Sequence, residues 1–153
     1  VELIKKKIAF NNTIFIVGNG GSSSIASHVS VDFIKSANIK SSTFNNANLI
    51  TCYANDYGYE NWVKEAIKTY CDVKDLLILI SSSGCSKNIV NAAKHCKKNN
   101  VDFITLSGFN ENNELSKLGN INFFVNSTNY NYVEMTHHII LVSIVDVFAK
   151  NIL

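Results

Sequence analysis

The chain has 153 residues, of which 46% are apolar, and a formal net charge of +2. This length suffices for one domain with a sizeable core. The 14 lysines are scattered, which excludes a basic stripe for nucleic acid or a basic patch for a membrane surface. No apolar run reaches the length of a membrane span, and no signal peptide is visible. We expect a single domain over residues 1–153 that binds neither nucleic acid nor membrane.

Short apolar runs alternate along the chain with amphipathic segments of helix length. The runs are rich in Ile, Leu, Val and Phe without clean alternation, which is typical of strands buried on both faces. The predicted strands are Thr13–Gly18, Leu49–Tyr53, Leu76–Ser81, Asp102–Leu106 and Ile121–Val125. The predicted helices are Ser23–Ser36, Tyr59–Tyr70, Lys87–Asn99 and Asn131–Asn151, and Val1–Phe10 has the pattern of a helix end. This alternation predicts a three-layer α/β/α sandwich with a five-stranded parallel sheet.

The cysteines of the chain are Cys52, Cys71, Cys85 and Cys96. They form no CxxC pair and have no zinc-finger spacing. Cysteines of this kind are typical of free thiols in a reducing compartment. We therefore expect a cytoplasmic protein.

Two loops rich in glycine and serine each join a predicted strand to a predicted helix. Gly18–Ser22 reads GNGGS and Ser81–Ser86 reads SSSGCS. In a parallel sheet both loops fall at the carboxyl ends of strands, where ligands bind. Glycine lets the backbone approach a ligand, while serine hydroxyls and the N–H groups at a helix start favour an anion. Because several donors converge, the pattern favours a phosphate over a carboxylate.

A plainer interpretation of these loops stays open. Glycine and serine are also ordinary turn formers and helix caps. Neither loop has the spacing of a nucleotide-binding fingerprint. Two such loops in one small α/β chain nevertheless favour a ligand site.

Histidines and carboxylates occur at helical spacing on two predicted helices. His28 and Asp32 are four residues apart, and Glu134, His137 and His138 crowd the last helix. Residues four apart lie on one helix face, and such His–carboxylate pairs can bind zinc or transfer protons. A surface or capping pair is the competing interpretation.

Three stretches resemble the sugar isomerase (SIS) domain family, and within it the phosphoheptose isomerases: GNGGSSSIASH, NDYGYE and ISSSGCSKNIVNAAKHCKKNNVDFITLSG. The resemblance covers nearly the whole chain. It implies a flavodoxin-like SIS fold with a further N-terminal helix, which this chain lacks or begins within. It also implies a ketose–aldose isomerase that converts sedoheptulose 7-phosphate to D-glycero-D-manno-heptose 7-phosphate. The product would feed heptose synthesis for a surface lipopolysaccharide or capsule.

The resemblance also implies a role for individual residues and an assembly. The implied phosphate ligands are the serines of the second loop, Ser81, Ser83 and Ser86, with Ser82 beside them. The implied sugar contacts are Asn19, Gly20, Ser22 and Asp56. The implied assembly is a homotetramer with its sites between subunits, so that the last helix would meet the serine loops of a neighbour.

The chain departs from the family on two predicted helices, the one that follows the first serine loop and the last one. The family has His and Glu four apart on the first of them, where this chain has His28 and Asp32. On the last helix the family has Gln, then His three residues later, then a metal-binding, acid–base His eight residues after the Gln. Glu134 stands at the Gln, His137 at the first His and Val142 at the last. Valine neither binds metal nor transfers a proton.

Two hypotheses follow from this departure. In the first, the site is remodelled, and a zinc or acid–base set forms from His28, Asp32, Glu134 and His138, with Asp32 as the base. In the second, catalysis is lost, and the chain binds a sugar phosphate or a protein, as some SIS proteins bind the replication initiator. An isomerase for another sugar phosphate, such as arabinose 5-phosphate, is a third possibility. The intact loops and the NDYGYE stretch favour an enzyme.

Overall fold

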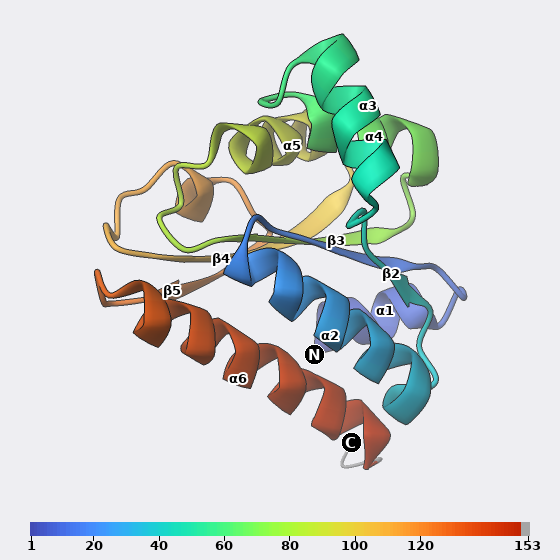
Figure 1. Cartoon of the computed structure of the whole chain (residues 1–153). Helices are drawn as coiled ribbons and strands as arrows, with labels where there is room; N and C mark the ends of the chain where they lie inside the picture. Colours follow the sequence, from blue (N-terminus) through green and yellow to red (C-terminus); the bar gives the residue numbers. More distant parts are fainter. Residues whose placement is uncertain (151–153) are drawn as a thin grey trace.

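The computed structural model describes residues 1–150 and contains a five-stranded parallel sheet between two layers of helices (Figure 1). The strands are β1 (Ile14–Val17), β2 (Ser41–Ser42), β3 (Leu76–Ser81), β4 (Asp102–Gly108) and β5 (Ile121–Val125). The helices are α1 (Glu2–Ile8), α2 (Gly21–Ala37), α3 (Ala47–Tyr57), α4 (Trp62–Tyr70), α5 (Lys87–Lys98) and α6 (Tyr130–Ala149), with a 3-10 turn at Leu115–Lys117. The predicted three-layer sandwich is confirmed.

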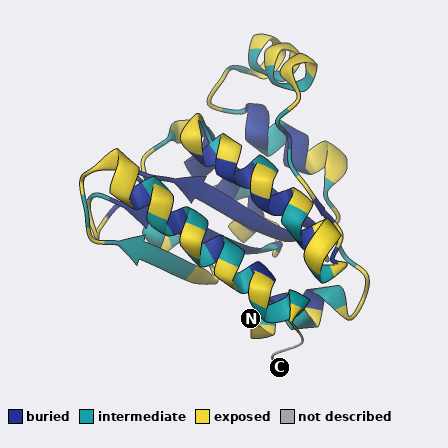
Figure 2. Cartoon of the chain, turned by 60° about the horizontal axis from the view of Figure 1, so that its bottom comes forward, coloured by how far each residue is buried: buried dark blue, intermediate teal, exposed yellow. Residues whose placement is uncertain are grey.

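Two apolar cores form because alternate side chains of a strand point to opposite faces of the sheet. In β1, Ile14 and Ile16 belong to the core under α1, α2 and α6, whereas Phe15 and Val17 belong to the core under α3, α4 and α5. The central strands are therefore dark blue in Figure 2, while β5 at the sheet edge is only half-buried. The burial of both faces explains the lack of clean alternation in the sequence.

The prediction of a strand at Leu49–Tyr53 is wrong, because this segment lies inside α3. The second strand is instead the two-residue β2, which pairs with β1. Asn46 caps α3, since its side-chain oxygen accepts two backbone N–H groups at 3.0 and 3.2 Å. The apolar residues of the segment recur at helical spacing and pack half-buried on the core. They are Leu49, Ile50, Tyr53 and Ala54.

The first residues of three predicted helices differ from the structure. The helix predicted from Ser23 begins two residues earlier, at Gly21, so that the first serine loop runs directly into the helix. The helix predicted from Tyr59 begins at Trp62. The last predicted helix begins one residue earlier, at Tyr130, and its predicted end at Asn151 lies outside the described residues.

Helix α6 is long and apolar enough, by length and composition alone, to cross a membrane. In the structure it packs along α2 and against the sheet. Its fully buried residues lie on one face, and they are Val133, His137, Leu141 and Val145. On the opposite side of α6 Met135 and Ile139 are exposed, and Val31 and Ile34 are exposed on α2. Figure 2 shows exposed and half-buried turns along both helices.

All four cysteines are free thiols, as the sequence predicts. Cys96 is buried, and burial raises the pKa of its thiol to about 12. Burial also raises the pKa of the Cys71 thiol. Both thiols are therefore poor nucleophiles at neutral pH.

Candidate functional site

In the sheet order β2-β1-β3-β4-β5, the chain adds β2 on one side of β1 and then crosses to add β3 on the other side. In flavodoxin-like sheets the ligand crevice lies at that point, beyond the carboxyl ends of the strands. Both serine loops follow these two strands, and a pocket of about 270 Å³ opens between them. Its lining consists of residues 19–22, 80–83 and 86, with Tyr130 and Glu134 from α6. A larger hollow of about 440 Å³, lined by Lys6 and Phe10 among others, lies at the opposite ends of the strands.

The pocket gathers the loop residues that the sequence predicts to bind a ligand. All seven of them line it. They are Asn19, Gly20, Ser22, Ser81, Ser82, Ser83 and Ser86. The loops are separated by about sixty residues in the sequence, and only the pairing of β1 with β3 brings them side by side.

Two helix starts border the pocket, and each presents the positive end of a helix dipole to it. Gly20 precedes α2 and Ser86 precedes α5, and neither helix start has a side-chain cap among the described residues. The first N–H groups of a helix have no partner within the helix, and they carry the positive end of its dipole. Ser81 donates to Ser86 over 2.9 Å between their hydroxyl oxygens, which holds the second loop closed on itself. The pocket is therefore suited to an anion.

An amide pair that we did not predict connects the two loops. Asn19 Nδ2 donates to Asn88 Oδ1 at 2.9 Å, and Asn88 Nδ2 donates to Asn19 Oδ1 at 2.8 Å. The Tyr59 hydroxyl also donates to Asn19 Oδ1, at 3.3 Å. With its oxygen used twice, Asn19 can offer the pocket only its remaining N–H, a donor. Asn88 is thus a positioning residue, and its place in the first turn after the second loop was the signal available in the sequence.

His28, Asp32 and His138 lie together, but not in the pocket. His28 Nε2 is 3.0 Å from Asp32 Oδ2, and the rings of His28 and His138 are 4.8 Å apart. None of the three lines the pocket. Seven residues of α2 separate Gly21 from His28, a distance of about 10 Å along the helix. The group is therefore close to the pocket, on the surface shared by α2 and α6.

Glu134 and Asp56 occupy different surroundings. The Glu134 carboxylate contacts Gly21, and Ser82 donates to its Oε1 at 3.5 Å, so Glu134 belongs to the pocket. Asp56 is exposed on α3, where its Oδ1 accepts from Asn55 at 2.9 Å, and it does not line the pocket. Val142, at the position of the last family histidine, is half-buried in the core under α2 and α6.

The predicted zinc ligands do not converge in the described part of the chain, which contains no group of three or more His, Cys, Asp and Glu side chains able to hold a metal. The Glu134 carboxylate lies against Gly21. His138 Nε2 is buried and has no hydrogen-bond partner among residues 1–150. Zinc binding stays a prediction, and no step below depends on a metal.

His137 belongs to the packed interior of the fold, whereas its neighbour His138 is only half-buried. His137 is fully buried, and its Nε2–H donates to the Ser107 carbonyl at the end of β4, at 3.1 Å. Burial lowers the pKa of His137, and the hydrogen bond to Ser107 opposes this only in part. The imidazole is therefore held neutral in the folded chain.

We expect His137 to make the fold sensitive to acid. In the unfolded chain a histidine takes up a proton as the pH falls below about 6.5, whereas folded His137 resists protonation. The free energy of unfolding should therefore fall as the pH drops from 7.5 to 5.5, because the unfolded state then binds more protons. Urea denaturation at several pH values measures this slope. His137→Gln should be less stable at pH 7.5 but show a flatter slope, and equal slopes would contradict the assignment.

Comparison with known proteins supports the fold and the family. Residues 1–108 match the SIS domain. Phosphoheptose isomerase 2 of Campylobacter jejuni is 35% identical over 116 residues, and the match covers 71% of this chain but 56% of that relative. The phosphoheptose isomerase of Sulfurimonas denitrificans is 28% identical over 143 residues, covering 90% and 73%.

The solved structure of a phosphoheptose isomerase from Neisseria gonorrhoeae superimposes with a TM-score of 0.89 at 21% identity, covering 97% of this chain and 82% of that one. At this identity the likeness concerns the fold. Together with the match over residues 1–108 and the two serine loops at the β1–β3 crevice, it establishes that the chain belongs to the SIS domain family.

Proposed function

We propose that the chain is a ketose–aldose isomerase for a sugar phosphate, with sedoheptulose 7-phosphate as substrate and D-glycero-D-manno-heptose 7-phosphate as product. The observation that carries this proposal is the pocket where two serine loops and two helix starts converge. A phosphate can accept several hydrogen bonds at once, which suits this set of neutral donors. The names of the Campylobacter and Sulfurimonas relatives support the same reaction.

The proposed mechanism orients the sugar along α2. The phosphate binds at Ser81, Ser83 and Ser86, next to the start of α5. The carbonyl end then extends past Glu134 toward His28 and Asp32. Conversion of the ketose to the aldose moves one proton between adjacent carbons and one between the oxygens that they carry.

In this mechanism Asp32 is the base. It removes a proton from carbon 1 of the ketose and, through the enediol, returns it to carbon 2. His138 moves a proton from the oxygen on carbon 1 to the oxygen on carbon 2, so that atoms and charges balance. His28, 3.0 Å from Asp32, orients the carboxylate.

A homotetramer with sites between subunits is part of the proposal. Met135 and Ile139 are exposed apolar side chains on α6, and Val31 is one on α2. The proposal takes them as part of an interface between copies of the chain. His28 and Asp32 lie on the surface shared by these two helices. A second copy would therefore enclose the proposed acid–base group and exclude water from it.

The test is turnover of sedoheptulose 7-phosphate by the purified chain, with and without added zinc. We expect measurable isomerisation by the folded oligomer, and a gain on zinc addition if His28, Asp32, Glu134 and His138 rearrange around the metal. Absence of turnover in both conditions, from a folded oligomer, would overturn the proposed reaction. Assays with other sugar phosphates, such as arabinose 5-phosphate, test whether the chain isomerises a different substrate.

A non-catalytic binding module is the second candidate. The observation that favours it is Val142, which packs in the core where the family places a histidine. In that case calorimetry would detect sugar-phosphate binding without turnover, or the chain would bind a protein such as a replication initiator.

A further inference from the structure

Glu134 is the only charged side chain among the described residues that line the pocket. The other lining residues are asparagine, glycine, serine, isoleucine and tyrosine. The pocket therefore carries one full negative charge although its helix starts are suited to an anion. A charge in this position must affect which ligands the pocket accepts.

The Glu134 carboxylate lies at one end of the pocket, against the start of α2. A Cβ placed on Gly21 would be 2.9 Å from Glu134 Oε1 and closer still to Oε2, so the carboxylate lies in the space that the glycine leaves open. Ser82 donates to Oε1 at 3.5 Å from the second loop. The carboxylate thus lies beside the first residue of α2, and it leaves the start of α5 to a ligand.

This arrangement gives the pocket two chemically different ends. At the α5 end, Ser81, Ser83 and Ser86 offer neutral donors. At the α2 end, the ionised Glu134 only accepts hydrogen bonds, so it favours hydroxyl groups. A second phosphate or a carboxylate there would lie beside a like charge in a partly desolvated pocket, where repulsion is strong.

We propose that Glu134 makes the pocket selective by charge, accepting ligands with one phosphate and rejecting those with a second anionic group at the opposite end of the sugar. This inference rests on the proposed function, because it takes sugar phosphates as the ligands. It adds the orientation of the ligand, with its phosphate at α5 and its neutral end passing Glu134 toward His28 and Asp32. The bisphosphates and acidic sugars of the cell would then be excluded.

The test compares the affinities for sedoheptulose 7-phosphate and sedoheptulose 1,7-bisphosphate by calorimetry. We expect the wild-type chain to prefer the monophosphate by about tenfold or more, a free-energy difference typical of one close charge pair. Glu134→Gln retains the side-chain length and removes the charge, so the preference should fall by about tenfold. Glu134→Asp retains the charge and should keep the preference.

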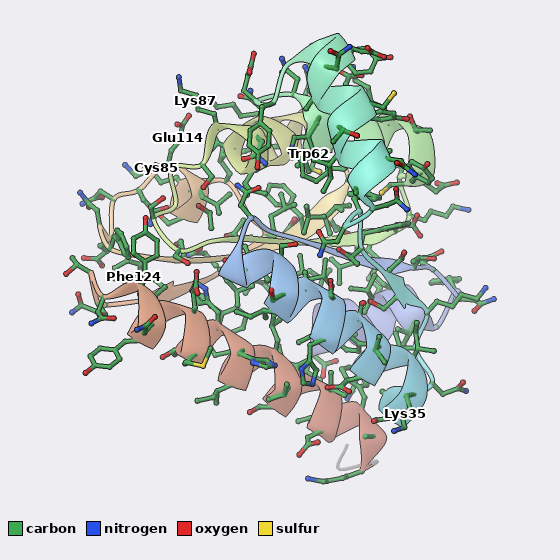
Figure 3. All side chains as sticks on the ribbon, in the orientation of Figure 1. Lys35, Trp62, Cys85, Lys87, Glu114 and Phe124 are labelled. Atoms are coloured by element: carbon green, nitrogen blue, oxygen red, sulfur yellow. The ribbon has the colours of Figure 1, made fainter. Side chains whose placement is uncertain are left out.

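Glu114→Gln is the matched control, because it makes the same change of net charge outside the pocket. Glu114 pairs with Lys94 on the α5 side of the sheet, in the neighbourhood of Lys87 and opposite α6 (Figure 3). This variant should retain the wild-type preference. An unchanged preference in Glu134→Gln, or its loss in both Glu134 variants, would overturn charge selection while leaving the proposed function standing. If the wild-type chain does not bind the monophosphate at all, the proposed function fails and charge selection fails with it.

Discussion

Replacing Gly84 by alanine should lower the free energy of unfolding by about 3 kcal/mol, from strain and overpacking combined. Gly84 has φ of +68°, a conformation that disfavours any side chain. A Cβ there would also lie within 2.7 Å of the Cβ of Asn113, which is buried. Asn113 cannot move away freely, since its side chain is hydrogen-bonded to Ser107, Gly108, Asn110 and Ser116. Urea denaturation measures the loss.

Gly20→Ala is the matched control for this prediction. Gly20 also has a positive φ, of +53°, but a Cβ there would meet nothing within 4 Å. Gly20→Ala should therefore cost only the backbone strain at φ of +53° and ψ of −121°, about 1–3 kcal/mol. The difference between the two variants isolates the contact with Asn113. Equal losses would show that Asn113 yields without cost, contrary to the prediction.

Gly84→Ala should also weaken phosphate binding. Gly84 lies between Ser83 and Ser86, and its carbonyl accepts the Leu115 N–H at 3.1 Å. A shift of this residue would separate the hydroxyls that converge on the pocket. Gly20→Ala alters the other loop, so the affinities of the two variants for inorganic phosphate compare the two ends of the site.

Replacing Asp32 by asparagine should reduce the turnover of sedoheptulose 7-phosphate by about 10²–10⁴-fold, the contribution typical of a general base. Asparagine has nearly the same shape but cannot take up a proton. Asp32 is half-buried on α2 and contacts His28, so the variant should fold and assemble as before. The turnover number should fall while the affinity for the sugar phosphate changes little, because the proposed phosphate ligands lie in the loop Ser81–Ser86, away from Asp32.

Asp146→Asn is the control for this prediction. Asp146 pairs with Lys150 on α6, and both side chains are exposed. The change of charge is the same, and turnover should stay at the wild-type level. If Asp32→Asn retains wild-type turnover, Asp32 is not the base, and Glu134, the carboxylate inside the pocket, becomes the residue to replace.

Local sequence determined much of the fold and the place of the site. The buried runs at β1, β3, β4 and β5 are long enough to be recognised, and a glycine–serine loop needs only its own residues to turn and to present donors. Because parallel strands share one carboxyl edge, the two loops could be assigned to one site from the sequence. The chemical difference between the two ends of the pocket could not be predicted in this way, because Glu134 comes from the distant helix α6.

The wrong strand at Leu49–Tyr53 and the missed strand β2 are both segments too short for their own sequence to decide their structure. Leu49–Tyr53 is a short apolar run, which fits a strand or a buried helix equally well, and the Asn46 cap and the packing of α3 on the core make it helical. The strand β2 has two residues, too few for any pattern, and exists because β1 offers it a free edge.

Contacts between distant segments decided the chemistry of the site. Asn88 pairs with Asn19 across 69 residues, and Glu134 reaches Gly21 from the last helix. The separation of His28, Asp32 and His138 from the pocket likewise depends on how α6 packs along α2. The sequence by itself determined the strands β1, β3, β4 and β5 and the two donor-rich loops, because these follow from neighbouring residues. Only the tertiary structure decided which side chains face one another, because that depends on the packing of whole helices against the sheet.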